Sequence, residues 1–276
     1  MNRTKQTDSL AWAASALLAC LAAPALAQTA PPLGMAQQFG ALGNSAVTGS
    51  TGTGTIVDGD VGSSPTPAIS NFPPSSAAFP YTVHLLNDTT VQLAHLDAIA
   101  AYNFLAAQGP GTVLADQLDG AVLTSGIYSF ASGAADLAAT GTLTLNGPGV
   151  FVFQVASALT ANDSSNVVGT ANPCDVYWRV GTSATLNGIT FSGNVIADAS
   201  VSLGPGANVT GKALAGTGAT GAVTMAGAGG NTLGGCSSVP NGPPIVEIPA
   251  LDHAGMGLLF LLLAGLGLFV MRRRAA

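Results

Sequence analysis

Residues 189–197 (ITFSGNVIA) are echoed by residues 207–215 (ANVTGKALA), and this repeat decides the fold. A second repeated triplet precedes each segment, Ala184-Thr185-Leu186 and then Val201-Ser202-Leu203, and it returns as Val223-Thr224-Met225. Apolar and polar residues alternate in these short runs, as in strands, and Gly, Pro and Asn separate them, as in turns. Three strands in a unit of about eighteen residues, in register with the next unit, predict a β-solenoid of triangular section. A meander or a sandwich is the alternative, although neither needs this register.

Two sides of the predicted solenoid expose mainly small residues with hydroxyl or amide groups. The first side is expected to present Thr144, Thr185, Ser202 and Thr224. The second side is expected to present Thr190, Ser192, Asn208 and Thr210. Thr144 is assigned to the first side because residues 142–147 (TLTLNG) resemble residues 183–188 (SATLNG).

The third side is apolar on both rows. Val195 and Ala213 belong to one row, and Ile196 and Leu214 belong to the opposite row. A sheet that is apolar on both faces needs a cover.

Residues 89–108 provide that cover, because their apolar residues recur near helical spacing without an internal Gly or Pro. Asp88 or Thr89 can cap the helix, and Gly109-Pro110 ends it. The residues expected to face the sheet are Val91, Ala94, Ile99, Tyr102, Leu105 and Ala106. His95 lies in this helix, where a packed or surface position is the expected role and a ligand or catalytic role is the alternative.

The first 27 residues have the parts of a secretory signal peptide. The start is positively charged, residues 10–21 are apolar, and Ala25-Leu26-Ala27 is an A-x-A cleavage pattern. We expect cleavage before Gln28 and export of the protein. Lipoprotein processing at Cys20 is the alternative.

Residues 255–271 are an uncharged apolar run, followed by three arginines at 272–274. As a helix this run would be roughly 26 Å long, just enough for a bilayer core. Together with residues 248–251 (IPAL), which precede it, the run makes residues 248–276 resemble Gram-negative sorting signals that begin Ile-Pro-Thr-Leu. We expect a sorting signal that is handled by the sorting machinery of the cell envelope. A permanent membrane anchor through residues 254–271 is the alternative, and in both cases the domain lies outside the cytoplasm.

Between the predicted signal peptide and the predicted C-terminal signal we expect one solenoid domain over residues 28–238 and a linker over residues 239–247.

Cys174 and Cys236 are the cysteines of this middle region. An even pair in an oxidising compartment predicts a disulfide. Such a bridge would close a loop of about 60 residues and stabilise the fold by about 4 kcal/mol in the chain-entropy model.

Charge is scarce, since Asp, Glu, Lys and Arg make up 7% of the chain. Between Gln28 and His253, Arg179 and Lys212 are the only Lys or Arg residues, which excludes sequence-independent nucleic-acid binding. The sequence contains no G-x-S-x-G, P-loop or H-E-x-x-H motif, and Asp58-Gly59-Asp60 lacks the later ligands of a Ca²⁺ loop. We therefore expect no enzyme activity, no cofactor and no metal.

Several segments along the chain carry a family resemblance. They are residues 39–62, 126–130, 141–145, 150–154, 174–181 and 211–215. In this order they resemble the bacterial and fungal ice-binding-like β-solenoid family, over roughly residues 33–236. The resemblance implies a right-handed, discontinuous β-solenoid with one long α-helix along one side, in a protein that is exported or surface-bound. It also implies ice as a partner, because characterised members adsorb to ice and inhibit its growth or recrystallisation.

Ice presents a lattice of oxygens without charge, so a protein that binds it needs many weak groups at regular spacing on a flat, rigid surface. Solenoid coils stack at about 4.8 Å, and outward residues two apart on a strand lie about 6.6–7 Å apart. Threonine suits such a surface because β-branching stiffens its side chain. Both the first and the second side are therefore candidate ice-binding surfaces. The alternative is a cell-surface scaffold or adhesin without strong ice affinity, because exposed strands favour Thr and Ser for other reasons.

Overall fold

The computed structural model describes residues 28–227 and 230–238. These residues form 23 β-strands, one α-helix and two short 3-10 helices, η1 (Gly34–Gln38) and η2 (Pro173–Asp175). The expectation of a mainly β solenoid with one long helix is confirmed. The predicted signal peptide (1–27), the linker (239–247) and the predicted C-terminal signal (248–276) lie outside the described residues.

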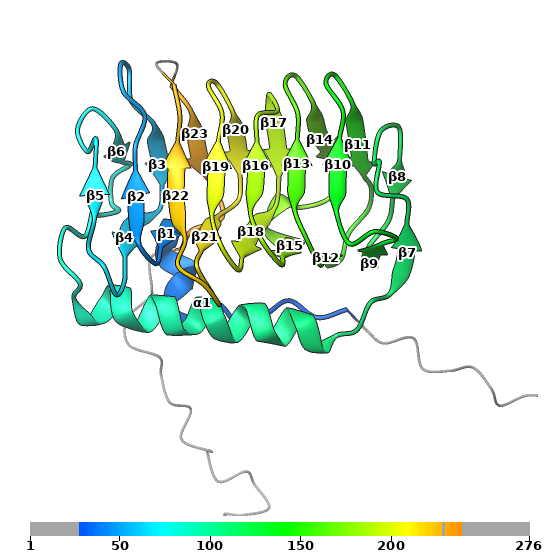
Figure 1. Ribbon diagram of the computed structural model, residues 1–276, viewed down its shortest axis with the longest axis horizontal. Coiled ribbons are helices and arrows are strands. Elements are labelled where there is room, and N and C mark those ends of the chain that lie inside the picture. Colours follow the sequence, from blue (N-terminus) through cyan, green and yellow to red (C-terminus); the bar gives the residue numbers. More distant parts are fainter. Residues whose placement is uncertain (1–27, 228–229, 239–276) are drawn as a thin grey trace, which may run out of the picture. The chain divides into compact units, whose positions relative to one another are not determined.

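Three parallel sheets form the three sides of the solenoid (Figure 1). Sheet A has the order β4 (Asp60–Ser63), β1 (Phe39–Gly43), β21 (Ala213–Ala215), β18 (Asn194–Ala197), β15 (Val176–Val180), β12 (Phe151–Val155), β9 (Gly126–Phe130), β7 (Thr112–Leu114). Sheet B has the order β10 (Ala135–Leu137), β13 (Leu159–Ala161), β16 (Ala184–Leu186), β19 (Val201–Leu203), β22 (Ala222–Met225), β2 (Ala46–Thr48), β5 (Ile69–Ser70). Sheet C has the order β6 (Ser76–Ala77), β3 (Ile56–Asp58), β23 (Thr232–Gly234), β20 (Asn208–Thr210), β17 (Thr190–Ser192), β14 (Asn166–Gly169), β11 (Thr142–Leu145), β8 (Val122–Leu123).

The coils do not follow one another along the stack in sequence order. Strands β1–β6 form two coils at one end, and α1 (Thr89–Ala107) then carries the chain along sheet A to the other end (Figure 1). From there the coils return until β21 pairs with β1, with Ala213 opposite Ala41. The solenoid is therefore discontinuous, as the family resemblance implies.

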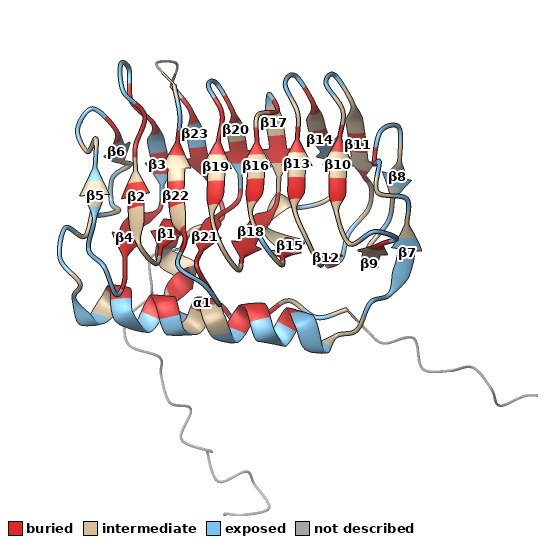
Figure 2. Ribbon diagram, in the orientation of Figure 1, coloured by how far each residue is buried: buried red, intermediate tan, exposed pale blue. Residues whose placement is uncertain are grey.

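The inside of the solenoid is filled by the inward residue of each alternating strand, which Figure 2 shows as buried segments in all three sheets. An aromatic stack runs through its centre. The ring centroids of Phe153 and Trp178 are 3.8 Å apart, and Tyr128 and Phe191 lie on either side. The indole Nε1 of Trp178 donates to the carbonyl of Ser192, and the hydroxyl of Tyr128 donates to the carbonyl of Thr124, so both polar side-chain atoms of the stack are satisfied.

A second core lies between sheet A and α1, as expected for the side that is apolar on both rows. Sheet A contributes Leu42, Val152, Tyr177, Ile196 and Leu214 to it. At the start of α1, the side chain of Asp88 accepts a hydrogen bond from the backbone N–H of Val91, so the predicted cap is confirmed.

The helix face differs in part from the expectation. Ala106 is exposed and Ile99 is only half-buried, whereas Ala98 and Ala101 are buried against the sheet. A period of 3.6 residues from Val91 and Ala94 leads to these alanines, and their small side chains let the helix approach closely.

His95 has the packed role that was expected. The side chain is buried in the sheet A interface, with Nε2 3.3 Å from Nδ2 of Asn44. Burial lowers the pKa of His95, which favours the neutral ring.

The assignment of Thr144 to the first side is wrong. Thr142 and Thr144 belong to β11 in sheet C, where Thr144 lies opposite Val122 and Val168. The misleading signal is the likeness of residues 142–147 to residues 183–188. Strands on different sides share the same alternation and the same Asn-Gly turn, so a local pattern does not identify the side.

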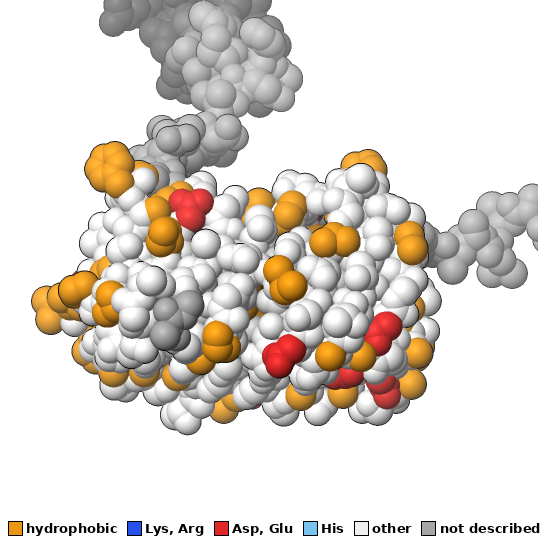
Figure 3. All heavy atoms as spheres, turned by 90° about the horizontal axis from the view of Figure 1, so that it is seen from above, with side chains coloured by type: hydrophobic (Ala, Val, Ile, Leu, Met, Phe, Trp, Pro, Cys, Tyr) orange, Lys and Arg blue, Asp and Glu red, His pale blue; other side chains and the backbone are white. Residues whose placement is uncertain are grey.

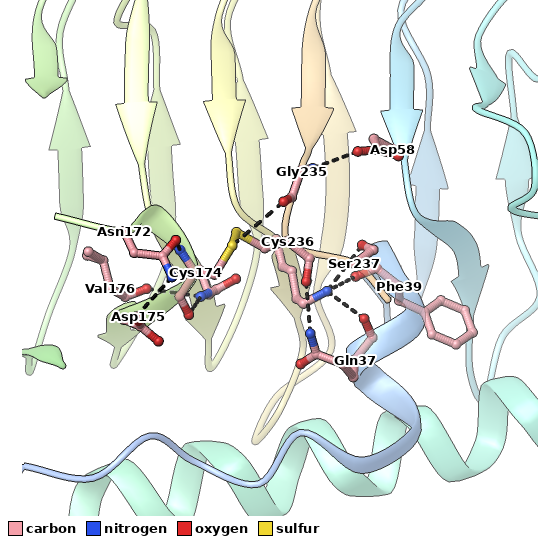
Figure 4. Close-up of a disulfide and its surroundings, with 12 residues drawn as sticks. Gln37, Phe39, Asp58, Asn172, Cys174, Asp175, Val176, Gly235, Cys236 and Ser237 are labelled. Atoms are coloured by element: carbon pink, nitrogen blue, oxygen red, sulfur yellow. Dashed lines mark hydrogen bonds between the residues drawn. A yellow bond between two sulfur atoms is a disulfide. The ribbon is translucent and has the colours of Figure 1, made fainter. Parts of the chain in front are cut away.

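The predicted disulfide between Cys174 and Cys236 is confirmed, with a Cα–Cα distance of 5.2 Å (Figure 4). It joins η2, before β15, to the segment after β23. Next to it, Nζ of the fully buried Lys212 donates to the carbonyls of Gln37 and Phe39 and to Oγ of Ser237. Burial lowers the pKa of Lys212 to about 7. These contacts hold the first and the last residues of the domain, near Gln37 and Ser237, against the start of β21.

Candidate functional surfaces

Sheet B carries one outward residue from each strand in a continuous row, which we call the sheet-B row. In spatial order the row is Asp136, Thr160, Thr185, Ser202, Thr224, Thr48 and Ser70. Each member pairs in register with the next. Strand spacing of about 4.8 Å gives the row a length of roughly 29 Å.

The sheet-B row stands on a tightly packed base. The residues that flank Thr185, Ser202 and Thr224 on their strands point into the core and are at most 1% exposed. The row itself is half-buried, except for Ser70, which is exposed. Strands of sheet B lie side by side along the solenoid in Figure 1, so the row follows one regular layer. Its hydroxyls are therefore held at fixed spacing by the backbone beneath them.

The sheet-B row contains one charged residue, Asp136, at one of its ends. Asp136 lies on the terminal strand β10, and its Oδ1 accepts a hydrogen bond from Nδ2 of Asn162. Beside the row, the hydroxyl oxygens of Ser183 and Ser200 accept hydrogen bonds from backbone N–H groups of the next strands. Seen from above, the visible face of the described domain shows no Lys or Arg, and most of its acidic side chains gather toward one end (Figure 3).

Sheet C carries two outward rows, and both are mixed. The first runs through Thr142, Asn166, Thr190, Asn208, Thr232, Ile56 and Ser76. The second includes Val122, Thr144 and Val168 on three neighbouring strands and Ser192, Thr210, Gly234 and Asp58 on four others. Large apolar side chains are exposed here, with Ile56 at 56% and Val122 at 64%.

Polar groups of sheet C are also partly engaged within the protein. Oγ of Ser192 donates to the carbonyl of Val167, and Oγ1 of Thr232 donates to Oδ1 of Asn208. In the sheet-B row, Oγ of Ser70 likewise donates to Oγ1 of Thr48. Sheet C therefore differs from the sheet-B row mainly in the large apolar side chains that interrupt its hydroxyls.

The structure separates the eight candidate residues into two groups. Thr185, Ser202 and Thr224 lie together in the sheet-B row. The remaining candidates lie in sheet C, and they are Thr144, Thr190, Ser192, Asn208 and Thr210.

The eight candidates from the sequence leave out four members of the sheet-B row, namely Thr48, Thr160, Ser70 and Asp136. A signal for Thr48 was present, since residues 46–48 and residues 222–224 are both Ala-Val-Thr and pair in register. Thr160 and Asp136 also lie between two apolar residues on their strands. The coils before residue 182 are longer than the repeat of about eighteen residues, since the paired Asp136 and Thr160 are 24 residues apart and the paired Thr160 and Thr185 are 25 apart, so the repeat did not lead to these two positions.

Neither a metal site nor a membrane-spanning helix is found in the part of the chain that the structure describes. Residues 28–227 and 230–238 contain no cluster of three His, Cys, Asp or Glu residues that could hold a metal ion. The same part of the chain contains no helix that is both long and apolar enough to span a bilayer.

Comparisons with known proteins agree with this architecture. The family model described as Ice-binding-like matches residues 41–229. An ice-binding protein of Nostoc sp. (strain HG1) is 38% identical over 242 residues, which cover 84% of this chain and 85% of the relative. Ice-binding protein 1 of Shewanella frigidimarina is 32% identical over 228 residues, although the match spans only 24% of that longer protein.

Solved structures show the same fold. The crystal structure of an ice-binding protein from the Antarctic ascomycete Antarctomyces psychrotrophicus has 34% identity and a TM-score of 0.65, and the match covers 76% of this chain and all of that one. The domain of Shewanella frigidimarina ice-binding protein 1 has 30% identity and a TM-score of 0.58, over 75% of this chain and 98% of that one. From residue 41 to residue 229, therefore, this chain belongs to the Ice-binding-like family.

Proposed function

We propose that the protein binds ice through the sheet-B row and thereby inhibits ice growth or recrystallisation, without catalysis. The observation that carries this proposal is the in-register row of six hydroxyl-bearing residues, from Thr160 to Ser70. The ice-binding names of the similar proteins support it.

Ice recognition by this row has a simple physical basis. Threonine methyl groups order the neighbouring water while the hydroxyls join the hydrogen-bond pattern of the ice. Each contact is weak, so binding depends on many contacts made together by a surface that loses little entropy on binding. The parallel strands provide this rigidity because their inward residues are close-packed.

Inhibition of ice recrystallisation by the purified domain, residues 28–238, tests the proposal. We expect crystals in a frozen sucrose solution to stay small in the presence of the folded domain. The same domain after heat unfolding and alkylation of its reduced cysteines is the control, and it should let the crystals coarsen. Equal coarsening with the folded domain at high concentration would contradict ice binding.

A cell-surface scaffold or adhesin without strong ice affinity is the second candidate. Sheet C favours it, because the exposed Ile56, Val122 and Val168 suit contact with another protein surface. In that case, deletion of the protein would weaken cell attachment, and substitutions in the sheet-B row would leave attachment unchanged.

Export and a temporary or permanent attachment to the cell envelope complete the proposal. The disulfide between Cys174 and Cys236 supports an oxidising compartment. We propose that residues 1–27 direct export, that residues 28–238 are the domain, and that residues 239–247 link it to a segment recognised by the sorting machinery, with residues 254–271 in the membrane. The mass of the mature protein in cell fractions would show whether residues 248–276 are removed.

A further inference from the structure

The outer face of α1 is largely apolar, although it is directed away from both cores of the protein, and its exposed polar residues Gln92 and Asn103 carry no charge. Leu93, Leu96, Ala100 and Phe104 lie at helical spacing along this face, and we call them the outer stripe. The exposed fractions of Leu93, Leu96 and Phe104 are 45%, 60% and 36%. A helix that is apolar on both faces is normally buried on both faces. The outer stripe therefore indicates a second contact.

The segment before α1 extends this apolar surface. Leu85 is 61% exposed and Leu86 is 74% exposed, just ahead of the cap residue Asp88. The single carboxylate of α1 belongs to Asp97, and its Oδ2 accepts a hydrogen bond from the backbone N–H of Met35, 2.7 Å away. No charged side chain of α1 therefore competes with apolar contacts at the outer stripe.

The chain leaves the described domain on this same side. The backbone N–H of Ser238 donates to the carbonyl of Gln37, which is part of η1, and η1 packs on α1. The hydroxyl of Tyr81 donates to the carbonyl of Ser237. The chain therefore leaves the described domain beside α1 and beside the segment that precedes α1. The uncharged apolar run 255–271 comes after this point in the sequence.

We propose that the outer stripe rests on the lipid surface into which residues 255–271 insert, with sheet A and α1 toward the lipid. This inference rests on the membrane attachment proposed above. Sheets B and C would then face away from the membrane, which leaves the sheet-B row accessible.

Chain length is compatible with this arrangement. Residues 239–254 can extend over at most roughly 55 Å, and α1 is about 29 Å long, so the tether allows the whole stripe to lie flat. A short tether gives a local concentration in the mM range, at which a weak apolar contact persists. Interfacial helices of this kind sit about 5–10 Å deep at the boundary between headgroups and acyl chains.

Electrostatic attraction to anionic lipid contributes nothing to this contact. Lys212 and Arg179 are the Lys and Arg residues between positions 28 and 238. The first is fully buried, and the guanidinium of the second stacks 4.3 Å from the ring of Tyr102. The proposed contact should therefore form on neutral phosphatidylcholine and should be insensitive to salt.

Fluorescence of residues 28–276, the chain without the proposed export signal, in phosphatidylcholine vesicles tests the proposal. An environment-sensitive label is attached at Leu96→Cys, and a matched control carries it at Thr185→Cys on sheet B. We expect the label at position 96 to shift to shorter wavelength and to lose most of its emission when nitroxide-labelled lipid is present. The label at position 185 should change in neither respect.

Three outcomes would overturn the proposal, and they differ from one another. If the protein floats with the vesicles but both labels respond alike, the outer stripe does not rest on lipid, although the membrane attachment stands. If the protein does not float with the vesicles, the attachment fails and the proposed contact fails with it. If the label at position 96 is shielded without vesicles, increasingly at higher protein concentration, a second copy of the chain covers the stripe.

Discussion

Gly211 stands at the tight corner between β20 and β21, where the chain turns from sheet C to sheet A. Its φ angle is +154°, and a Cβ at this position would overlap the carbonyl oxygen of Gly193 in the neighbouring coil. The stacking of two coils at this corner therefore requires glycine. Gly206 also has a positive φ, +75°, but a Cβ there would meet no atom within 4 Å.

This contrast predicts that Gly211→Ala destabilises the domain much more than Gly206→Ala. Gly206→Ala should cost about 1–2 kcal/mol of unfolding free energy, the usual cost of a left-handed conformation for a residue with a Cβ. Gly211→Ala adds a backbone clash that only a shift of the coil can relieve. Urea unfolding of both variants measures the difference, and equal destabilisation would show that the coils yield at this corner.

Single residues of the candidate surface were predictable where the repeat is regular. Thr185, Ser202 and Thr224 follow one another in the region where the repeated triplets are plain. Thr144 was misplaced because its strand has the same alternation as strands on the other sides. Alternation determines which residues point outward, whereas the side is determined by the path of the chain around each coil.

Among the elements, α1 depends on a polar contact at its start as well as on apolar packing. Nδ1 of His84 lies 2.9 Å from Oδ2 of Asp88, the cap residue, and Nε2 lies 3.4 Å from Oδ2 of Asp60 on β4. Hydrogen bonding to Asp60 is the main cause that raises the pKa of His84; burial opposes this rise, and Asp88 contributes to it. The protonated ring thus links the start of α1 to the solenoid.

The pH dependence of stability follows from this raised pKa. Protonated His84 contributes fully below the unfolded-state pKa of about 6.5, and its contribution is lost as the pH rises through the higher folded-state value. We therefore expect the stability difference between wild type and His84→Gln to shrink from pH 5.5 to about pH 8.

Thermal unfolding of both proteins over this range measures the difference. The comparison also removes the opposite effect of His95, whose pKa is lowered and which is present in both proteins. A difference that stays constant with pH would contradict the proposed link through His84.

The sequence predicted the type and position of the main elements better than it predicted which strands pair with one another. The bounds and packing side of α1 were clear because its apolar residues recur at helical spacing and sheet A needed a cover. The pairing of β1 with β21 was not derivable from local pattern, because these strands are joined only through the path of the whole chain. The shared Ala-Val-Thr of residues 46–48 and 222–224 is a local signal for the adjacent pair β2 and β22, but it stands outside the repeat of about eighteen residues.

At the scale of the whole molecule, this discontinuous winding lengthens the candidate surface. The coils that precede α1 in the sequence contribute Thr48 and Ser70 to the sheet-B row. The coils that follow α1 contribute Thr160, Thr185, Ser202 and Thr224. The row becomes continuous only when β2 pairs with β22. Contacts of Lys212 with Gln37, Phe39 and Ser237 hold the two groups of coils together close to that junction.

Ice binding through the sheet-B row is tested by comparing Thr185→Tyr with Thr190→Tyr in recrystallisation assays at equal protein concentration. Both residues are half-exposed and lie near the middle of their sheets, in B and C respectively, so each new ring would stand on one surface without disturbing the core. With unfolding temperatures that match the wild type, Thr185→Tyr should lose most of the ice activity and Thr190→Tyr should keep it. Full activity in Thr185→Tyr, or loss in Thr190→Tyr alone, would contradict the assignment of ice binding to the sheet-B row.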